Sequence, residues 1–223
     1  MSAITASIIF LAFLGYVVFQ LMKNFQLRNL NVSLQRQDYE TVEQICTMPI
    51  VRKLLGPYVS DLYQLRGYYM GQNMEKFEQH LKKMLQTTYQ DLDDKKNFLQ
   101  EYYHMFLLQG QRTYADWMLD SIRALGDPLY TQYNEQAYYV MLDKRSDLVE
   151  EMIDEINSKK YYGFPLGVIL FMIAKQYEYR QDRKNAETYY QNAKVCFHPS
   201  AIYVPIIEKN LERLASELGT APA

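Results

Sequence analysis

The side chains able to serve acid–base, redox or metal chemistry are few and far apart. His80, His104 and His198 form no HExxH or His-x-x-His pair, the spacings that let two histidines hold one metal. Cys46 and Cys196 form no CxxC pair, and the chain has neither a Gly-rich phosphate loop nor a G-x-S-x-G motif. The sequence therefore predicts no catalytic residue, no metal site and no cofactor. We expect the histidines on the surface or on helix faces and the cysteines in apolar packing.

An enzyme would need a convergent set of titratable groups with shifted pKa values, and this spacing does not supply one. The one close acidic cluster is Asp91, Asp93 and Asp94. It lacks the glycine of a calcium-binding loop and is expected to cap a helix. The sequence thus favours a protein that is not an enzyme.

The charge balance limits the partners. Of 223 residues, 24 are basic and 26 acidic, for a formal charge of −2. A protein that neutralises phosphates needs a basic face, so we expect no nucleic-acid partner. Two cysteines exclude a disulfide scaffold, and nine glycines and seven prolines in a chain rich in Leu, Gln, Lys, Glu and Met favour helices.

The helices begin with an apolar run. Ala3 to Met22 contains no Asp, Glu, Lys or Arg, and as a helix it is about 30 Å long, the thickness of a hydrocarbon core. A cleaved signal peptide would need a basic start, a shorter apolar stretch and a small-residue cleavage site. A buried soluble helix would need protein on every side. We predict a transmembrane anchor over residues 1–23, with residues 3–22 in the membrane.

Short polar breaks recur along the rest of the chain: Arg36-Gln37-Asp38, Gly71-Gln72-Asn73, Gln109-Gly110-Gln111, Asp143-Lys144-Arg145 and Arg180-Gln181-Asp182. Apolar residues spaced three and four apart, the helical period, flank each break. One series of positions before the breaks is Leu30, Leu65, Tyr103, Ala137 and Ala174, and one after them is Val42, Phe77, Ala115, Val149 and Ala186. Both series step by 35, 38, 34 and 37 residues, which predicts five helix–turn–helix units.

The chain resembles the tetratricopeptide repeat (TPR) family, which stacks antiparallel helix pairs. The fifth unit matches best, with Leu170, Ile173, Ala174, Tyr177, Ala186, Tyr190 and Ala193 in phase. The first unit departs from the pattern, with Ser33 in an aromatic position and Pro49 in an alanine position. The resemblance covers about residues 25–197. It implies an all-α fold, in which an α-solenoid of about five TPR-like repeats over residues 24–223 ends in a capping helix at about residues 202–218. Other α-solenoids stay open as alternatives.

A second apolar stretch, Tyr161 to Ala174, lies within the fifth unit. It has 14 residues and contains Pro165. Because it is too short to span a bilayer, it is predicted to be a buried helix.

In TPR arrays the first helices line a concave groove. Carried over to this chain, the register places nine residues there: Leu62, Arg66, Tyr69, Gln100, His104, Asn134, Tyr138, Phe171 and Lys175. Tyrosine with Arg, Asn and Lys is a composition that binding surfaces favour, and the resemblance implies an extended peptide or a partner helix as the ligand. An ordinary polar helix face is the alternative for each residue. The Lys/Asn pair that some members use for C-terminal carboxylates is incomplete here.

Two functions are consistent with this layout. The first is a non-enzymatic scaffold or adaptor at the cytoplasmic face, whose anchor raises its effective concentration toward membrane-bound protein partners. The second places the helical domain outside the inner membrane, as an accessory factor for folding or assembly of secreted proteins. Lys23, Arg28 and Arg36 directly follow the span, and the positive-inside rule then favours the first.

Overall fold

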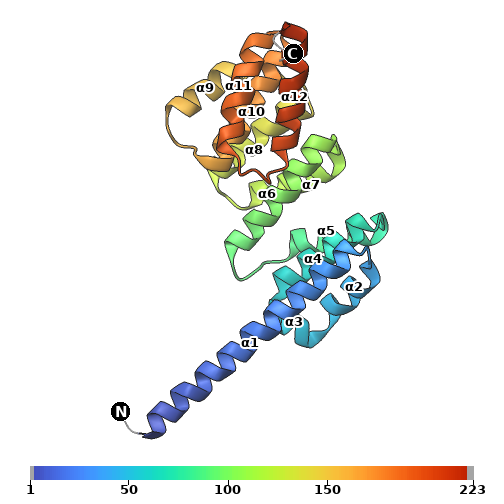
Figure 1. Ribbon diagram of the computed structural model, residues 1–223. Coiled ribbons are helices and arrows are strands. Elements are labelled where there is room, and N and C mark those ends of the chain that lie inside the picture. Colours follow the sequence, from blue (N-terminus) through green and yellow to red (C-terminus); the bar gives the residue numbers. More distant parts are fainter. Residues whose placement is uncertain (1–2, 220–223) are drawn as a thin grey trace. The chain divides into compact units, whose positions relative to one another are not determined.

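The structure is a computed structural model that describes residues 3–219, and over that range it contains α-helices and no β-strand. Twelve helices are present within these residues (Figure 1). This confirms the all-α class predicted from composition and periodicity.

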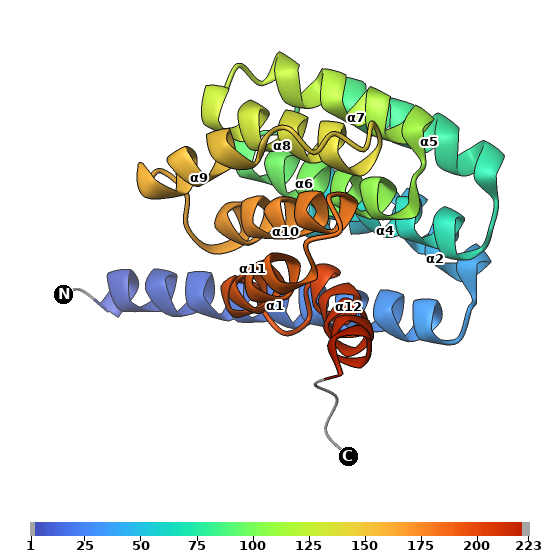
Figure 2. The same cartoon turned by 90° about the horizontal axis from the view of Figure 1, so that it is seen from above.

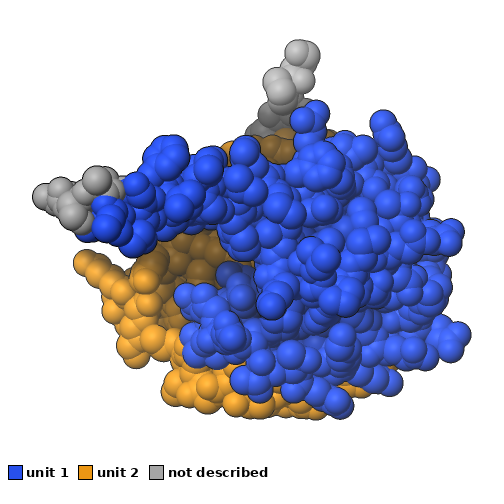
Figure 3. Space-filling view, turned by 90° about the horizontal axis from the view of Figure 1, so that it is seen from below, with its two compact units in different colours: residues 1–98 blue, residues 99–223 orange. Residues whose placement is uncertain are grey.

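The helices divide between two compact units, unit 1 (residues 1–98) and unit 2 (residues 99–223), coloured separately in Figure 3. Unit 1 holds α1 (Ala3–Gln35), α2 (Tyr39–Thr47), α3 (Pro49–Leu55), α4 (Pro57–Met70) and α5 (Met74–Gln86). Unit 2 holds α7 (Arg112–Ala124), α8 (Pro128–Met141), α9 (Val149–Asn157), α10 (Gly163–Tyr179), α11 (Arg183–Cys196) and α12 (Tyr203–Leu218). The boundary falls inside α6 (Leu92–Gln109).

Each of the five predicted breaks is a turn between two helices. At the first, Gln37 has a φ of 61°, and the N–H of Asp38 donates to the carbonyl of Ser33 at 2.9 Å, which ends α1. The Asp38 carboxylate then accepts the N–H of Thr41 at 3.1 Å and caps α2. The other breaks also contain one residue of positive φ: Gln72, Gly110, Lys144 and Gln181.

The two register series are also buried. All ten of their residues, from Leu30 to Ala186, lie on helices and are at most 1% exposed. The helix pairs therefore use equivalent positions to pack, at the spacing read from the sequence.

The apolar N-terminal helix is longer than predicted. α1 has 33 residues and passes the expected boundary at residue 23 without a break. Its first part is uncovered: Ile4, Phe10 and Leu11 are more than 60% exposed. By length and composition α1 qualifies, over Ser7–Gln35, as a helix able to cross a membrane. The side of the membrane stays a prediction.

The last third of α1 belongs to the core of unit 1. Leu30 is fully buried with Val42 and Cys46 of α2, and Leu27 and Leu34 pack around them. The three leucines are spaced three and four apart and so share one helix face. Burial raises the pKa of the Cys46 thiol to about 12, which agrees with the packing role expected for this cysteine.

The repeat pattern does not predict α3. This helix begins at Pro49, ends before Gly56 with a φ of 87°, and buries Val51 and Leu55 in the unit 1 core. It contacts α1, α2 and α4. Proline is favoured in the first turn of a helix. At the position where the TPR pattern has an alanine inside the second helix, Pro49 therefore starts a new helix.

Unit 2 is built around α10, which contacts α8, α9 and α11, while α12 packs on α11 (Figure 2). Every residue from Gly167 to Ala174 is buried. This confirms that the second apolar stretch is a buried helix. The predicted terminal helix at about residues 202–218 is present as α12.

Candidate functional site

The nine predicted groove residues lie on α4, α6, α8 and α10. On α4, in unit 1, Leu62, Arg66 and Tyr69 are half-buried. The Arg66 guanidinium lies 5.9 Å from the ring centre of Tyr63, and the rings of Tyr69 and Phe77 lie 5.2 Å apart. These three residues all lie on α4, and each is partly exposed to solvent.

In unit 2, three of the predicted groove residues are core residues. His104 of α6, Asn134 of α8 and Phe171 of α10 are fully buried. Tyr203, the first residue of α12, covers two of them: its hydroxyl lies 2.7 Å from Nδ1 of His104, and its ring centre lies 4.8 Å from that of Phe171. The Asn134 amide donates to the Tyr130 carbonyl at 2.7 Å. The groove prediction is corrected for these three residues, because a buried side chain offers no surface to a partner.

The three residues are buried because the first residue of α12 packs against this part of unit 2. The Tyr203 ring stacks on Phe197 with 4.9 Å between centres and lies 6.0 Å from Phe164, so it completes an aromatic cluster with residues of α6 and α10. Such clusters bury large apolar areas. A register taken from repeat spacing cannot foresee a contact between residues that are 99 positions apart, as His104 and Tyr203 are.

His104 is a neutral packing residue in this cluster. Burial lowers its pKa to about 3, so the imidazole is uncharged at physiological pH. Its ring stacks on Tyr133 at 6.2 Å and meets Phe164 edge-on at 5.2 Å. The expectation of a surface or helix-face histidine is wrong for His104.

The remaining predicted residues of unit 2 keep part of their surface but do not form one face. Gln100 is half-exposed on α6. The Tyr138 hydroxyl donates to Oδ1 of Asp116 at 2.5 Å and accepts from Nη1 of Arg112 at 2.8 Å, so Tyr138 points toward α7. Lys175 instead lines a cavity of about 420 Å³ with residues of α11 and α12.

The ionic groups of this cavity are already paired. Glu178 binds Nζ of Lys175 at 2.7 Å and also binds Arg213. Glu217 binds Arg183 at 2.7 Å and Arg213 at 3.0 Å. Burial and the Arg213 charge lower the pKa of Lys175. An ionic ligand would have to break these pairs to enter.

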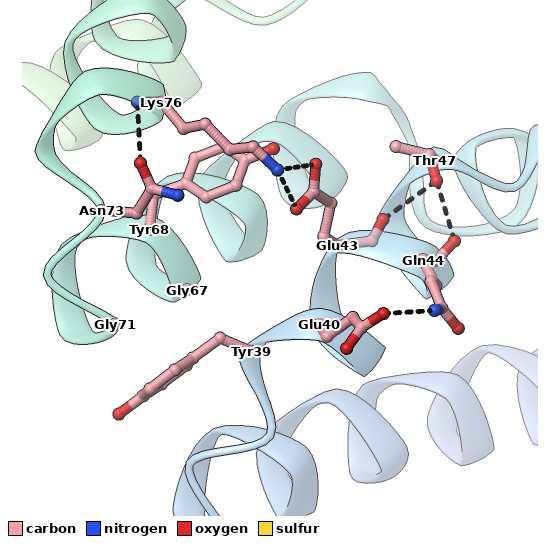
Figure 4. A pocket seen from close by; sticks show the side chains of 10 residues that line it. All are labelled: Tyr39, Glu40, Glu43, Gln44, Thr47, Gly67, Tyr68, Gly71, Asn73 and Lys76. Atoms are coloured by element: carbon pink, nitrogen blue, oxygen red, sulfur yellow. Dashed lines mark hydrogen bonds and ion pairs between the residues drawn. The ribbon is translucent and has the colours of Figure 1, made fainter.

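A second cavity, of about 550 Å³, opens in unit 1 between α2, the end of α4 and the start of α5 (Figure 4). Its volume is within the range of ligand pockets. None of the nine predicted residues lines it. The lining residues are Tyr39, Glu40, Glu43, Gln44, Thr47, Gly67, Tyr68, Gly71, Asn73 and Lys76. We call this cavity the α2–α5 pocket.

Two carboxylates of the α2–α5 pocket differ in their partners. Glu43 holds Nζ of Lys76 through both oxygens, at 2.8 and 2.9 Å, and this hydrogen bonding lowers the pKa of Glu43. The same ammonium lies 5.5 Å from the ring centre of Tyr68, within reach of a cation–π contact. Glu40, one turn earlier, accepts one long bond from Gln44 at 3.5 Å and has no ion pair in the described part of the chain.

Glycine shapes the wall opposite these carboxylates. A Cβ atom at Gly71 would lie 2.9 Å from Cδ2 of Tyr39 and 3.0 Å from the carbonyl oxygen of Gly67. Any side chain at this position would therefore displace the Tyr39 ring, which borders the pocket (Figure 4). The width of the pocket depends on this close approach.

The other cluster of titratable groups in unit 1 surrounds Asp61 of α4, whose side chain is 2% exposed. Its Oδ1 binds Arg52 at 2.8 Å and Lys83 at 3.3 Å, and its Oδ2 accepts from the Tyr89 hydroxyl at 3.3 Å. Nε2 of His80 lies 3.0 Å from the Asp61 carbonyl. Burial by itself would raise the pKa of Asp61, but the Arg52 hydrogen bond and the nearby charges lower it. The cluster joins α3, α4 and α5, with both carboxylate oxygens in use.

Within residues 3–219, no three His, Cys, Asp or Glu side chains are grouped as metal ligands would be. Reasoning from the sequence missed both the α2–α5 pocket and the Asp61 cluster. A signal for the first existed, since Lys76 follows Glu43 by 33 positions, close to one repeat length, and the pair joins equivalent second helices. Asp61 carries no such signal.

No protein-family model matches the chain, and no curated protein and no solved structure matches it.

Proposed function

We propose that this protein is a membrane-anchored, non-enzymatic scaffold that captures a protein or peptide partner at the cytoplasmic membrane face. One observation carries the proposal: α1 is a single helix that exposes large apolar side chains along its first part and joins the unit 1 core with its last third. An apolar rod of this length suits a hydrocarbon solvent. The same helix then holds unit 1 next to the bilayer.

The energetics of insertion support this placement. An apolar residue at the centre of a spanning helix contributes about −0.3 to −0.6 kcal/mol, whereas a basic residue costs about 2.5–3.5 kcal/mol. No charged side chain precedes Lys23, and only basic ones occur between Lys23 and Asp38. This asymmetry supports the cytoplasmic side for the C-terminal body.

We further propose that the helix pairs are TPR-like repeats of an α-solenoid. Support comes from the burial of all ten register positions and from the left-handed residue in each of the five turns. Within each unit, neighbouring pairs also pack: α2 contacts α4, and α8 contacts α10. Nearest-neighbour packing of this kind is typical of solenoids.

The α2–α5 pocket is our proposed partner site. Glu43 and Tyr68 already hold the ammonium of Lys76, which supports a pocket chemistry suited to cations. Glu40 adds a carboxylate that has no ion pair within the described residues. We therefore propose a lysine or arginine side chain of the partner as the occupant.

Replacing Leu11 and Leu14 together by arginine is expected to remove the protein from the membrane. Each arginine near the centre of the span costs about 2.5–3.5 kcal/mol, which outweighs the gain from several apolar neighbours. The measurement is the fraction of protein that stays in the membrane pellet after alkaline carbonate extraction. The matched control replaces the same two leucines by phenylalanine and should stay in the pellet.

Release of the unchanged protein by carbonate would contradict the anchor. A reporter enzyme fused after Ala223 then reads the side of the membrane. Activity of a cytoplasm-specific reporter supports the proposed orientation. Activity of a reporter that works only outside would instead establish the accessory-factor topology.

Glu40→Lys is expected to lower partner capture about tenfold, equivalent to ~1.4 kcal/mol, because it replaces the proposed ligand of a basic side chain by a like charge. A photocrosslinking residue at Gln44, on the pocket wall, would report capture in intact membranes. The adduct is identified by mass spectrometry, and its yield is compared between variants.

Glu75→Lys is the matched control. Glu75 lies at the start of α5, outside the lining of the pocket, and the substitution makes the same change in net charge. An adduct whose yield falls equally in both variants would point to general electrostatics, and an adduct that Glu40→Lys leaves intact would rule out this pocket.

A further inference from the structure

α3 lies beside the part of α1 that leaves the proposed membrane span. α2 runs back along α1 after the turn at Gln37, so its nine residues return the chain at Thr47 to the level of about residue 27 of α1. Two packing facts agree with this level: α3 contacts α1, and Leu27 packs on the cluster that contains Val51 and Leu55. Figure 1 shows α3 beside the C-terminal half of α1.

This level corresponds to the headgroup layer of a bilayer. At 1.5 Å per residue, Leu27 lies about 7–8 Å beyond Met22, the last residue of the apolar run. The headgroup region extends about 5–8 Å beyond the hydrocarbon core on each side. If residues 3–22 fill the core, α3 is therefore inside the headgroup layer.

The outer face of α3 is apolar and uncovered. Ile50 is 74% exposed, and Met48, which precedes the helix, is 49% exposed, although Val51 and Leu55 are buried on the other face. Phe25 of α1, close to the same level, is 60% exposed. A single exposed apolar residue is ordinary, but three at the level where α1 leaves the span are what an interfacial contact requires.

The charges at this level complement lipid phosphates. The first acidic residue of the chain is Asp38, and none occurs between Glu43 and Asp61. Asp61 itself is buried and paired with Arg52. Anionic lipid attracts basic residues that lie within a Debye length of the surface. Apart from Arg52, the basic residues of segments 23–35 and 44–60 are Lys23, Arg28 and Lys53.

We propose that α3 and Phe25 form a second membrane contact, which rests on the proposed membrane placement of α1. Ile50 and Met48 enter the headgroup layer and reach toward the acyl chains, and Lys53 lies against lipid phosphates. A single spanning helix can tilt toward any side of unit 1. The α3 contact favours a tilt of α1 toward the side on which α3 lies, and so determines which face of unit 1 is turned toward the membrane.

The test places a tryptophan at three depths in the full chain. Trp117, the single native tryptophan, is replaced by phenylalanine, and Phe19→Trp, Ile50→Trp or Met74→Trp is added. Each variant is reconstituted in nanodiscs of phosphatidylcholine and phosphatidylglycerol that carry bromine near the top of the acyl chains. We expect strong quenching for Phe19→Trp and Ile50→Trp, and emission close to that in unbrominated lipid for Met74→Trp.

The three positions separate the possible failures. Quenching at 19 and 50 but not at 74 supports the contact. Quenching at 19 alone overturns the α3 contact and leaves the anchor in place, an outcome also expected if a protein covers Ile50. No quenching at 19 overturns the anchor and the contact together. Quenching at all three positions overturns a specific contact, because unit 1 would then lie flat on the bilayer.

Discussion

Replacing Asp61 by alanine is expected to lower the free energy of unfolding of unit 1 by about 3 kcal/mol, because the change leaves Arg52, Lys83 and the buried Tyr89 hydroxyl without their shared acceptor. Arg52 and Lys83 are partly exposed, with side chains 29% and 55% accessible, and can turn toward water, which keeps the effect at the low end for a buried pair. The Tyr89 hydroxyl is buried and cannot, whereas His80 keeps its partner, the backbone carbonyl of residue 61. Hydrogen exchange of the α3–α5 amides in the full chain measures the loss.

Two variants make the Asp61 result specific. Asp93→Ala removes an exposed carboxylate from the same unit and should change stability by less than about 0.5 kcal/mol. Replacing Asp61 by leucine together with Arg52 by methionine removes both charges and should recover part of the loss. Equal protection in Asp61→Ala and Asp93→Ala would show that the cluster contributes nothing. Because the pKa of Asp61 is lowered, its contribution is present above about pH 4 and lost as the pH falls through the folded value.

Acidification from pH 7 to pH 5 is expected to lower the unfolding free energy of unit 2 by about 2 kcal/mol through His104 alone. Burial lowers the pKa of His104 to about 3, whereas an unfolded histidine takes up its proton near pH 6.5. Between pH 6.5 and pH 5, His104 is therefore protonated in the unfolded state but stays neutral in the folded state. About 1.5 pH units at about 1.4 kcal/mol each give the stated loss. Stability is full above pH 6.5 and falls as the pH drops toward 3.

Urea unfolding of the full chain in detergent, followed by Trp117 fluorescence, measures this effect, since Trp117 lies on α7 of unit 2. His104→Gln removes the titrating group and should flatten the pH dependence over this range. His80→Gln is the matched control, because burial also lowers the pKa of His80 but this residue lies in unit 1. A wild-type transition with the same midpoint at pH 7 and pH 5 would contradict a neutral, buried His104.

Local and periodic features could be predicted from the sequence. Three of the turns are each followed at once by a residue that caps the next helix: Asp38, Asn73 and Asp182. Such turns depend on residues that are adjacent in the sequence. The buried α10 followed from apolar content and length, and the terminal α12 was implied by the resemblance to TPR arrays. The TPR assignment and the anchor's orientation stay predictions.

Contacts between distant residues could not be predicted. The residues around His104 in the sequence do not indicate its contact with Tyr203. The groove prediction was wrong where α12 covers the predicted residues with an aromatic side chain. The pair Lys95-Lys96 is typical of a solvated face, yet Lys95 is buried and donates to the carbonyls of Met84 and Leu85 at 2.6 Å. Such residues take their role from the surrounding fold.

The unbroken course of α1 has a mechanical consequence. No glycine or proline interrupts it between Lys23 and Gln35, and a rod of 33 residues is about 50 Å long. Under the proposed placement, the apolar half of α1 and unit 1 move as one rigid body, so the tilt of α1 in the bilayer also sets the orientation of unit 1. A thinner bilayer inclines such a rod further, and the mouth of the α2–α5 pocket must swing through the same angle. The thickness of the membrane would thus determine the direction from which a partner reaches the pocket, without any ligand.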